Sequence, residues 1–534
     1  MRNKFSAVML AACTIALSGC GDQSSIALTT STAETVETAE TDKAAIETDS
    51  EDAVDAETAD PANTSGSANE GSAKDKSYGT GDKFECTDDE SHAIHADGTT
   101  ESYDNISVEK TGDADGDNSD FYGTNAAVYA ENNADLTIKD SYIHTAGSHA
   151  NAVFSYGDGT TVHISDSKIE TEQNNSGGVM VTGGGTLIAD DLDVDTKGGS
   201  SAAIRSDRGG GTLTVNGGEY RSYGSGSPAV YSTADITVND AELYSDISQA
   251  VVVEGKNSVT LNNTDAVGNN THKNSDKSER FQAVMVYQSM SGDAAEGKGV
   301  FRMNGGSLTS LNEGMFFVTN TVAEIELDNV ELIPASDDLL RIEKAGWGNE
   351  GSNGGQVTFT ANDQAMSGIV TVDDISSLNL ILTGDSVFEG SIENAGEVYV
   401  ELSENAVWKL TADTAISSLT CGKNSIDLNG HALTVNGTAY TEGTESEGKA
   451  IEVKVSENSG HKPEMKDGKP GDGDGSHGPE NVGPGDGGHG NGKPGSDKEK
   501  PDRKPDNSND KPEHKKPDSD KADANESAGE SSKA

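Results

Sequence analysis

The chain has 534 residues, of which 32% are hydrophobic and 5% aromatic, and its formal net charge is −54. A compact α/β enzyme of this length usually carries more apolar mass, and so acidic a chain would repel the phosphates of a nucleic acid. Nine of the 12 prolines lie between Pro463 and Pro517, so the composition differs between segments and each segment is considered separately.

Residues 1–20 are predicted to be an export signal. Arg2 and Lys4 give a basic start, and the apolar run 7–16 is too short to span a bilayer as a stable helix. The run leads into Leu-Ser-Gly-Cys at 17–20, which resembles the bacterial lipobox. The resemblance implies that Cys20 carries two or three acyl chains, which would anchor an exported protein to the outer face of the cell membrane. The alternative is an ordinary signal peptide with a chance cysteine.

Two flanking segments have compositions typical of disorder. Residues 21–85 are rich in Thr, Ala, Ser, Asp and Glu, which predicts an acidic tether that repels itself. Residues 451–534 are rich in Gly, Pro, Lys and Asp and have almost no large apolar side chains, which predicts a disordered tail. The ordered domain is therefore expected at residues 86–450.

An acidic cluster lies near the start of this domain, at Asp113, Asp115, Asp117 and Asp120. Closely spaced carboxylates suit Ca²⁺, which takes roughly six to eight oxygen ligands. The spacing is not that of an EF-hand, because Gly116 and Thr124 stand at the wrong positions. Two interpretations stay open, a calcium site and a solvated acidic loop, and no other cofactor is expected.

The body then repeats. Its first units begin at Asn125, Asn151, Gly177, Ala202 and Pro228, at steps of 26, 26, 25 and 26 residues, and later units begin at Ala250, Ala283, Met315, Leu339 and Ile369. Each unit has a first strand such as 127–130, a Gly/Asn turn, a second strand such as 136–138, another turn and a third strand around a residue such as Ile143. Within each strand, apolar and polar residues alternate, so one face is buried and the other is not.

This pattern predicts an all-β fold, a parallel β-helix with three short strands per coil. No strand buries enough apolar surface alone, whereas strands stacked about 4.8 Å apart bury a continuous core. A β-sandwich is the alternative, but it would need antiparallel hairpins rather than a recurrent three-strand order. In a stack, Cys86 and Cys421 would lie far beyond the reach of a disulfide, so both thiols are expected to be unpaired and buried.

The repeat, the lipobox-like start and the Asn-Gly-Gly turns at 216–218 and 304–306 together resemble right-handed parallel β-helix proteins of the pectate-lyase-like superfamily. More narrowly, they resemble β-helix surface lipoproteins of Gram-positive bacteria. The resemblance covers about two thirds of the chain. It implies the fold and its right-handed coiling, but it says little about function, because this fold carries lyases, hydrolases, sugar-binding modules and adhesins.

Aligning the first strands of the units places one outward-facing residue of each in a column. Its members are Tyr129, Phe154, Met180, Arg205, Tyr231, Val252, Met285, Phe317 and Arg341. If exposed, this column would form an aromatic and cationic ladder suited to sugar rings or to the apolar surface of a partner. The alternative is that the column packs beneath the tether, a loop or a cap.

Three long insertions, at 268–281, 287–299 and 345–356, direct attention to the later units. The last two follow first strands and should overhang the column. Trp347 on the third insertion is expected either to stack on a saccharide or to form a small loop core.

Arg205, Asp207 and Arg208 stand together in a body that is poor in arginine. Two guanidinium groups suit a carboxylate ligand such as a uronic acid. The alternative is local ion pairing with Asp207 and neighbouring acids.

Catalytic residues are not assigned. Arg205, Arg341 or Lys344 would be the candidate base of a lyase, but the local patterns of pectate lyases are missing. The polygalacturonase-like pair Asp337-Asp338 is not accompanied by a Gly-His-Gly in the body. We therefore expect a non-catalytic, lipid-anchored surface protein that binds extracellular polysaccharide or acts as an adhesin towards a host or neighbouring cell. The alternatives are a lyase or glycoside hydrolase acting on acidic glycans, and a purely structural role.

Overall fold

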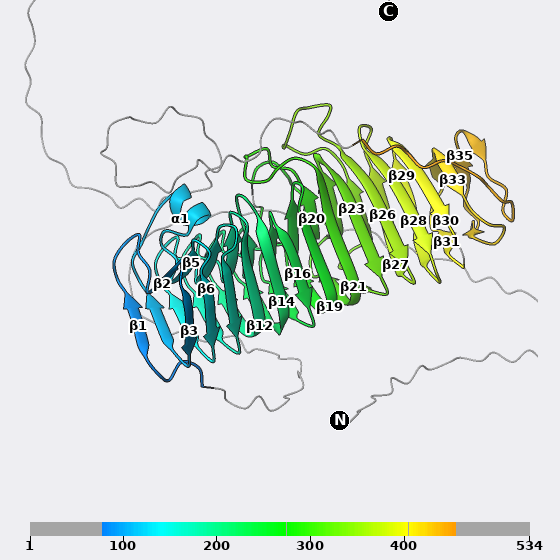
Figure 1. Cartoon of the computed structure of the whole chain (residues 1–534). Helices are drawn as coiled ribbons and strands as arrows, with labels where there is room; N and C mark the ends of the chain where they lie inside the picture. The colour runs from blue at the N-terminus through cyan, green and yellow to red at the C-terminus, as the bar shows by residue number, and fades with distance from the viewer. Residues whose placement is uncertain (1–76, 274, 404, 455–534) are drawn as a thin grey trace, which may run out of the picture. The chain divides into compact units, whose positions relative to one another are not determined.

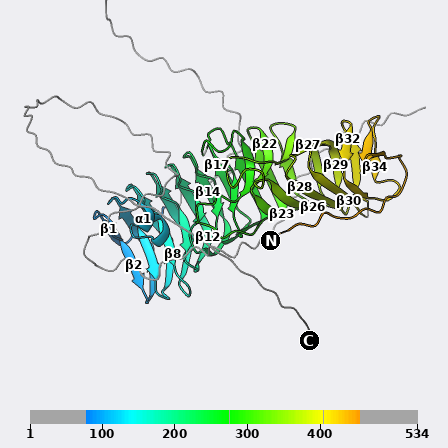
Figure 2. The same cartoon turned by 90° about the horizontal axis from the view of Figure 1, so that it is seen from above.

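The computed structural model describes residues 77–454, except 274 and 404, and these residues coil into a stack of β-strands (Figures 1 and 2). The predicted signal peptide with Cys20, most of the predicted tether and nearly all of the predicted tail lie outside the described residues. Within the described part, no helix has the length and apolar character needed to cross a membrane.

Strands of the described residues form two long parallel sheets, one of 14 strands and one of 19 strands. The 14-stranded sheet contains the first strands of the coils from β2 to β29 and ends with β31 and β34: β2 (Ile94–Asp97), β5 (Val128–Glu131), β8 (Val153–Tyr156), β11 (Val179–Thr182), β13 (Ile204–Ser206), β15 (Val230–Ser232), β18 (Val251–Glu254), β20 (Gln282–Tyr287), β22 (Gly314–Thr319), β25 (Asp338–Ile342), β27 (Ala365–Val372), β29 (Val387–Asn394), β31 (Val407–Leu410) and β34 (Ile426–Asp427).

The 19-stranded sheet contains β1 (Lys83–Cys86), β3 (Thr100–Asp104), β4 (Ser107–Lys110), β6 (Asp135–Lys139), β7 (Tyr142–Thr145), β9 (Thr161–Ser165), β10 (Lys168–Thr171), β12 (Gly185–Thr196), β14 (Gly211–Ser222), β16 (Asp235–Asn239), β17 (Glu242–Ser245), β19 (Ser258–Gly268), β21 (Lys298–Ser310), β23 (Thr321–Asp328), β24 (Glu331–Ile333), β26 (Gly355–Asn362), β28 (Ser377–Thr383), β30 (Glu397–Leu402) and β33 (Ser418–Thr420). A small third sheet of β32 (Thr414–Ile416), β35 (Leu433–Val435) and β36 (Thr438–Ala439) lies near the C-terminal end, and α1 (Asp117–Tyr122) precedes β5.

Equivalent residues of successive coils stack in register, as the repeat predicts. Val128 pairs with Val153, Val153 with Val179, Val179 with Ile204, and Ile204 with Val230. All five side chains are fully buried and belong to one apolar core that extends from Ile94 to Leu433. The prediction of an all-β parallel β-helix is therefore confirmed.

The division of each coil into three short strands holds only in part. In β12, β14, β19 and β21 the second and third strands run on as one bent strand. The bend of β14 is at Gly217, whose φ of 74° lies in the left-handed region, and an added Cβ there would sit 2.2 Å from Asp191 Oδ1. In β27 and β29 the third strand instead joins the next first strand, whereas β31 pairs only with the first half of β29.

An amide ladder lies along the outer turns of the 19-stranded sheet. The Nδ2 atoms of Asn239, Asn262 and Asn304 each donate to the Oδ1 atom of the ladder residue one coil earlier, at 2.9, 2.8 and 2.8 Å. Asn216 begins the ladder and donates to Asp190 at 2.8 Å. Such side-chain bonds tie adjacent coils together beyond their backbone hydrogen bonds.

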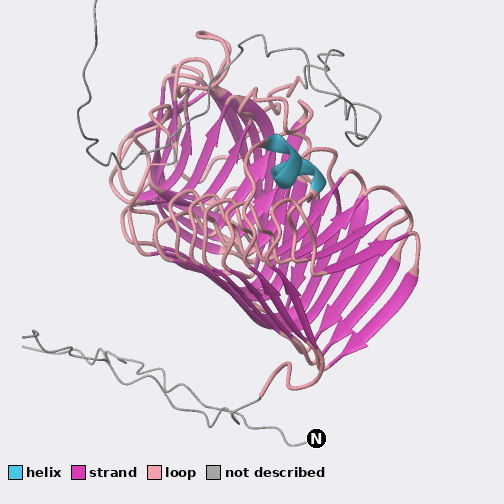
Figure 3. Ribbon diagram, turned by 90° about the vertical axis from the view of Figure 1, so that its left-hand side faces the viewer, coloured by secondary structure: helices cyan, strands magenta, loops and turns pink. Residues whose placement is uncertain are grey.

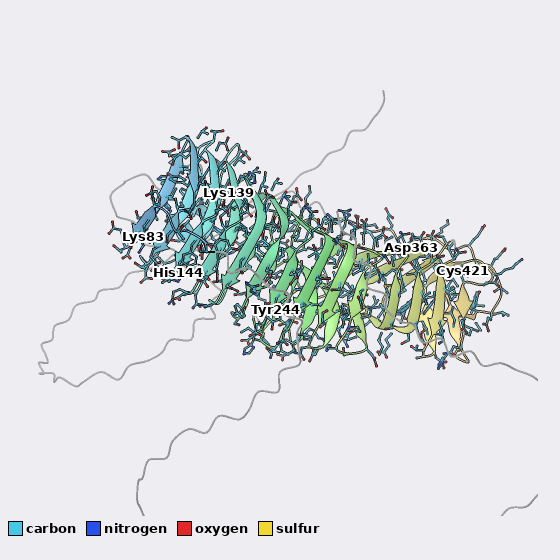
Figure 4. The ribbon with its side chains drawn as sticks, turned by 90° about the horizontal axis from the view of Figure 1, so that it is seen from below. Lys83, Lys139, His144, Tyr244, Asp363 and Cys421 are labelled. Carbon is cyan, nitrogen blue, oxygen red and sulfur yellow. The ribbon has the colours of Figure 1, made fainter. Side chains whose placement is uncertain are left out.

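The two cysteines of the described residues confirm the expectation for them. Cys86 and Cys421 are both buried and free. Cys86 ends β1, and Figure 4 places Lys83 of the same strand at one end of the stack and Cys421 near the other. The described domain also extends slightly beyond the predicted limits of 86–450, since β1 begins at Lys83 and Ile451 exchanges hydrogen bonds with the Asn379 side chain.

Candidate functional site

The predicted outward column exists, but it is not exposed. Its residues stack in the predicted order from Tyr129 to Arg341. Phe154 is 0% exposed and Phe317 is 2% exposed. Of the two interpretations of the column, the structure thus shows the covered one: two other parts of the chain pack over it and leave a cleft between them.

The first cover is α1, which lies against the outside of the strands (Figure 3). Its Phe121 is nearly buried, and the Phe121 carbonyl accepts a hydrogen bond of 2.7 Å from Thr182 Oγ1. The helix ends at Tyr122 and is capped by Gly123, which has the left-handed conformation. Beneath this segment, Tyr129 and Phe154 form a small apolar cluster with Met180, separate from the main core.

The acidic cluster belongs to the same cover, and its carboxylates face different partners. Asp113 accepts the backbone N–H of Ser148 at 2.9 Å, Asp120 pairs with His149 at 2.9 Å, and Asp115 is exposed. Asp117 lies 3.8 Å from an Arg208 nitrogen. Across the described residues, no group of three or more His, Cys, Asp or Glu side chains is placed to hold a metal ion.

The second cover is the insertion after β25. Its Trp347 is 8% exposed and packs on Val252, Met285 and Phe317 of the column. The Asn353 side chain holds this loop closed by donating to the Ala345 and Trp347 carbonyls at 2.6 and 3.0 Å. The structure thus confirms the overhang of this insertion, and it places Trp347 in a small loop core.

Arg205 and Arg208 do not form a carboxylate clamp, which was one of the two interpretations of the sequence; Arg205 instead faces Asp207. Arg205 and Asp207 are both more than nine-tenths buried, and they pair with each other at 3.1 Å. Arg205 also donates to the Ser200 carbonyl at 3.1 Å, while burial raises the pKa of Asp207 to about 7 against the opposing charge of Arg205. The structure thus shows the alternative of local ion pairing. Arg341, further along the column, pairs in the same way with Asp338.

Arg208 has a different position, between the two covers. Its guanidinium group lies over the Phe121 ring, 3.9 Å from the ring centroid, in a cation–π contact. Its Nε donates to Asp293 Oδ1 at 2.8 Å, and Asp293 lies on the insertion after β20. Arg208 therefore links α1 to a loop that is far away in the sequence.

A cleft of about 860 Å³ lies between the two covers, and it is the candidate functional site. Tyr231, Glu254 and Tyr287 line it from the 14-stranded sheet. The other lining residues come from α1, from Arg208 after β13 and from the insertions after β19, β20 and β25. Of the residues proposed from the sequence, the cleft contains Asp117, Arg208, Tyr231 and Trp347. Tyr129, Phe154, Arg205, Asp207, Phe317 and Arg341 do not line it.

Glu254 organises the side of the cleft formed by the sheet. It is 1% exposed, and its carboxylate accepts hydrogen bonds from the Tyr231 hydroxyl, from the Tyr287 hydroxyl at 3.0 Å, and from the Ser289 hydroxyl and backbone N–H. Burial raises its pKa, against the effect of these hydrogen bonds. Because both oxygens are occupied, Glu254 positions two tyrosines and the start of a loop.

Sequence reasoning missed Glu254, Tyr287 and Asp293. Glu254 and Tyr287 pair directly in neighbouring strands, two residues after Val252 and Met285 of the column. Alternate residues of a strand share a face, so the residues two positions after the column form a second column on the same face. The strand period could therefore have identified Glu254 and Tyr287. Asp293 lies on an insertion without a repeat, so no periodic signal marks it.

No known protein family, no curated protein and no solved structure matches this chain. The finer resemblance to pectate-lyase-like proteins and to surface lipoproteins therefore has no support from relatives, and the candidate site is interpreted from its own geometry.

Proposed function

We propose that the cleft binds sugar residues of an extracellular polysaccharide, and that the protein is a non-catalytic binding protein of the cell surface, anchored through lipid on Cys20. The observation that carries this proposal is a cleft of about 860 Å³ that combines aromatic rings with many hydroxyl, amide and charged groups. Ligand sites commonly have volumes of roughly 300–1,000 Å³. A neighbouring cell surface that displays such a glycan would be bound by the same site.

The lining suits a sugar in particular. Tyr231 and Tyr287 are half-buried aromatic side chains in the lining of the cleft, and aromatic rings are suited to contact with the C–H groups of a sugar ring. Ser291 and Asn349 also line the cleft and supply hydrogen-bonding groups for sugar hydroxyls. Arg208 lies over Phe121 of α1 and pairs with Asp293 on the insertion after β20, so contacts within the chain fix two of the segments that line the cleft.

One observation favours a glycoside hydrolase as the second candidate. A buried carboxyl with a raised pKa, as in Glu254, is what a general acid requires. Four hydrogen bonds to its two oxygens and the pairing of Asp293 with Arg208 argue against it, because neither carboxylate is left to act on a substrate. Release of reducing ends from a bound glycan would favour the hydrolase.

The test uses the full chain carrying Cys20→Ala, which can be purified without lipid, on an array of plant and microbial polysaccharides. Tyr231→Ala is expected to weaken binding of the best glycan at least about tenfold, which corresponds to about 1.4 kcal/mol. Tyr223→Ala is the matched control, because Tyr223 is an exposed tyrosine at the end of β14, outside the cleft. Equal binding by both variants, with melting temperatures unchanged, would refute the site.

A further inference from the structure

The cleft adjoins a second cavity of about 440 Å³. Met290, Gly348 and Asn349 line both, so the two cavities meet at the tips of the insertions after β20 and β25. Met290 is 49% exposed at this junction. The two cavities are therefore neighbours, and Met290 lies where they adjoin.

The second cavity has one acidic and one basic lining residue, Glu296 and Lys454, and its other polar lining groups are uncharged. Asn320, Thr321, Ser352 and Gln356 present amides and hydroxyls. The Asn320 side chain donates to the Gln288 carbonyl at 2.7 Å, and Gln356 Oε1 accepts the Lys454 backbone N–H at 3.1 Å. Such groups, fixed by the chain itself, are suited to the hydroxyls of a sugar and offer little to an apolar ligand.

The charges of the main cleft disfavour an acidic ligand. Its lining contains three acidic residues, Asp117, Glu254 and Asp293, and two basic residues, Arg208 and Lys277. Arg208 is already paired with Asp293 and lies near Asp117. The chain as a whole carries a formal charge of −54, which adds long-range repulsion towards polyanions.

Resting on the proposed function, we infer that the ligand is a linear, uncharged glycan long enough to occupy both cavities, with the second cavity as a further sugar subsite. This reverses the expectation from Arg205 and Arg208 of a uronic acid ligand, since one of these guanidinium groups is buried and both are paired with carboxylates. Amide and hydroxyl groups select neutral sugars, and the junction at Met290 makes recognition depend on chain length.

The first experiment tests charge. The full chain with Cys20→Ala is titrated calorimetrically, at low ionic strength, with hexasaccharides of β-1,4-glucan, β-1,4-mannan and β-1,4-xylan and with hexagalacturonate. We expect at least one neutral hexasaccharide to bind at least about tenfold more tightly than hexagalacturonate. Tighter or equal binding of hexagalacturonate would overturn the inference and leave the proposed function standing. Binding of none of the four, together with an empty polysaccharide array, would overturn the proposed function itself.

The second experiment tests the subsite with the neutral glycan that binds best. We expect its hexasaccharide to bind at least about tenfold more tightly than its trisaccharide. Gln356→Ala should remove most of that gain and leave trisaccharide binding unchanged. Thr358→Ala is the matched control, since Thr358 is half-buried, two residues further along β26 and outside the cavity, and it should change neither affinity. Equal affinities of the two oligosaccharides for the unaltered protein, or an unchanged gain in Gln356→Ala, would overturn the second subsite.

Discussion

The carboxylate of Glu254 joins three parts of the cleft. It accepts hydrogen bonds from Tyr231 one coil before it, from Tyr287 one coil after it, and from Ser289 at the start of an insertion. A buried carboxylate is costly unless donors compensate it, and here several donors converge on it. The part of the burial cost that these donors do not offset raises the pKa of Glu254. Glu254 therefore binds its proton more tightly in the folded chain than in the unfolded chain.

This difference leads to a pH-dependent prediction for Glu254→Gln. A carboxyl whose folded-state pKa lies above its ordinary value of 4.5 binds its proton more tightly in the folded state. Its contribution to stability is thus full below the ordinary value and is lost as the pH rises through the folded-state pKa. The melting temperatures of the unaltered protein and of Glu254→Gln are compared from pH 4 to pH 8. The melting temperature of the unaltered protein minus that of the variant should be largest at pH 4 and should fall as the pH rises. A difference in melting temperature that grows with pH would contradict burial as the dominant influence on the pKa of Glu254.

For single residues, the sequence predicted the strand face that a side chain occupies better than it predicted what packs against that side chain. Arg205 and Asp207 were placed on the outward face of their strand, where they are, and local pairing was one of the two interpretations. Their burial could not be predicted, because the segments that cover them lie outside the repeat. Periodicity reports which face of a strand a residue occupies, but it says nothing of what lies on that face.

Among the elements, α1 shows how a short insertion shapes the site. Gly123 ends the helix with φ of 71°, and an added Cβ would lie 2.8 Å from a Tyr129 ring carbon and 2.9 Å from the Phe154 ring. The chain passes over the two rings at this point with no space for a side chain. The position of α1 as one wall of the cleft therefore depends on a residue without a Cβ.

Gly123→Ala tests this dependence, with Gly305→Ala as the control. Gly305 has a φ of 66° but nothing within 4 Å of its added Cβ, so both substitutions place an alanine at positive φ and only Gly123→Ala also meets the rings. We expect Gly123→Ala to lose about 1–3 kcal/mol more stability than the control, measured by denaturant unfolding, and to weaken glycan binding. Equal losses in the two variants would show that α1 is not tightly packed on Tyr129 and Phe154.

The elements of the repeat were predictable and the covers only partly so. Strands with alternating residues recur in every coil, so their existence and register followed from the period. The insertion carrying Trp347 was predicted to overhang the column because it directly follows a first strand. The six residues of α1 were interpreted as an acidic cluster instead, because so short a helix leaves no periodic signal and its aspartates dominate the segment.

For the whole molecule, the described solenoid explains the fold but not the location of the protein, which rests on the first twenty residues. We predict that Cys20→Ser shifts the chain from the membrane fraction of a bacterial host to its soluble fraction and abolishes incorporation of labelled palmitate. Cys421→Ser is the control: Cys421 is buried and free, so this variant should stay lipidated and in the membrane fraction. Lipid anchoring would be contradicted if the unaltered protein were found in the soluble fraction, or if Cys20→Ser still incorporated labelled palmitate.

The in-register stacking of the coils also determines how the molecule responds to a mechanical load. The backbone hydrogen bonds that join one coil to the next run along the axis of the stack, and most coils contact only their neighbours. Traction between a tethered end and a glycan held in the cleft would therefore detach coils one after another rather than rupture the domain at once. Each detached coil of about 25 residues would release roughly 90 Å of slack, and the contacts of α1 with Arg208 and Thr182, which span several coils, would resist the first of these steps.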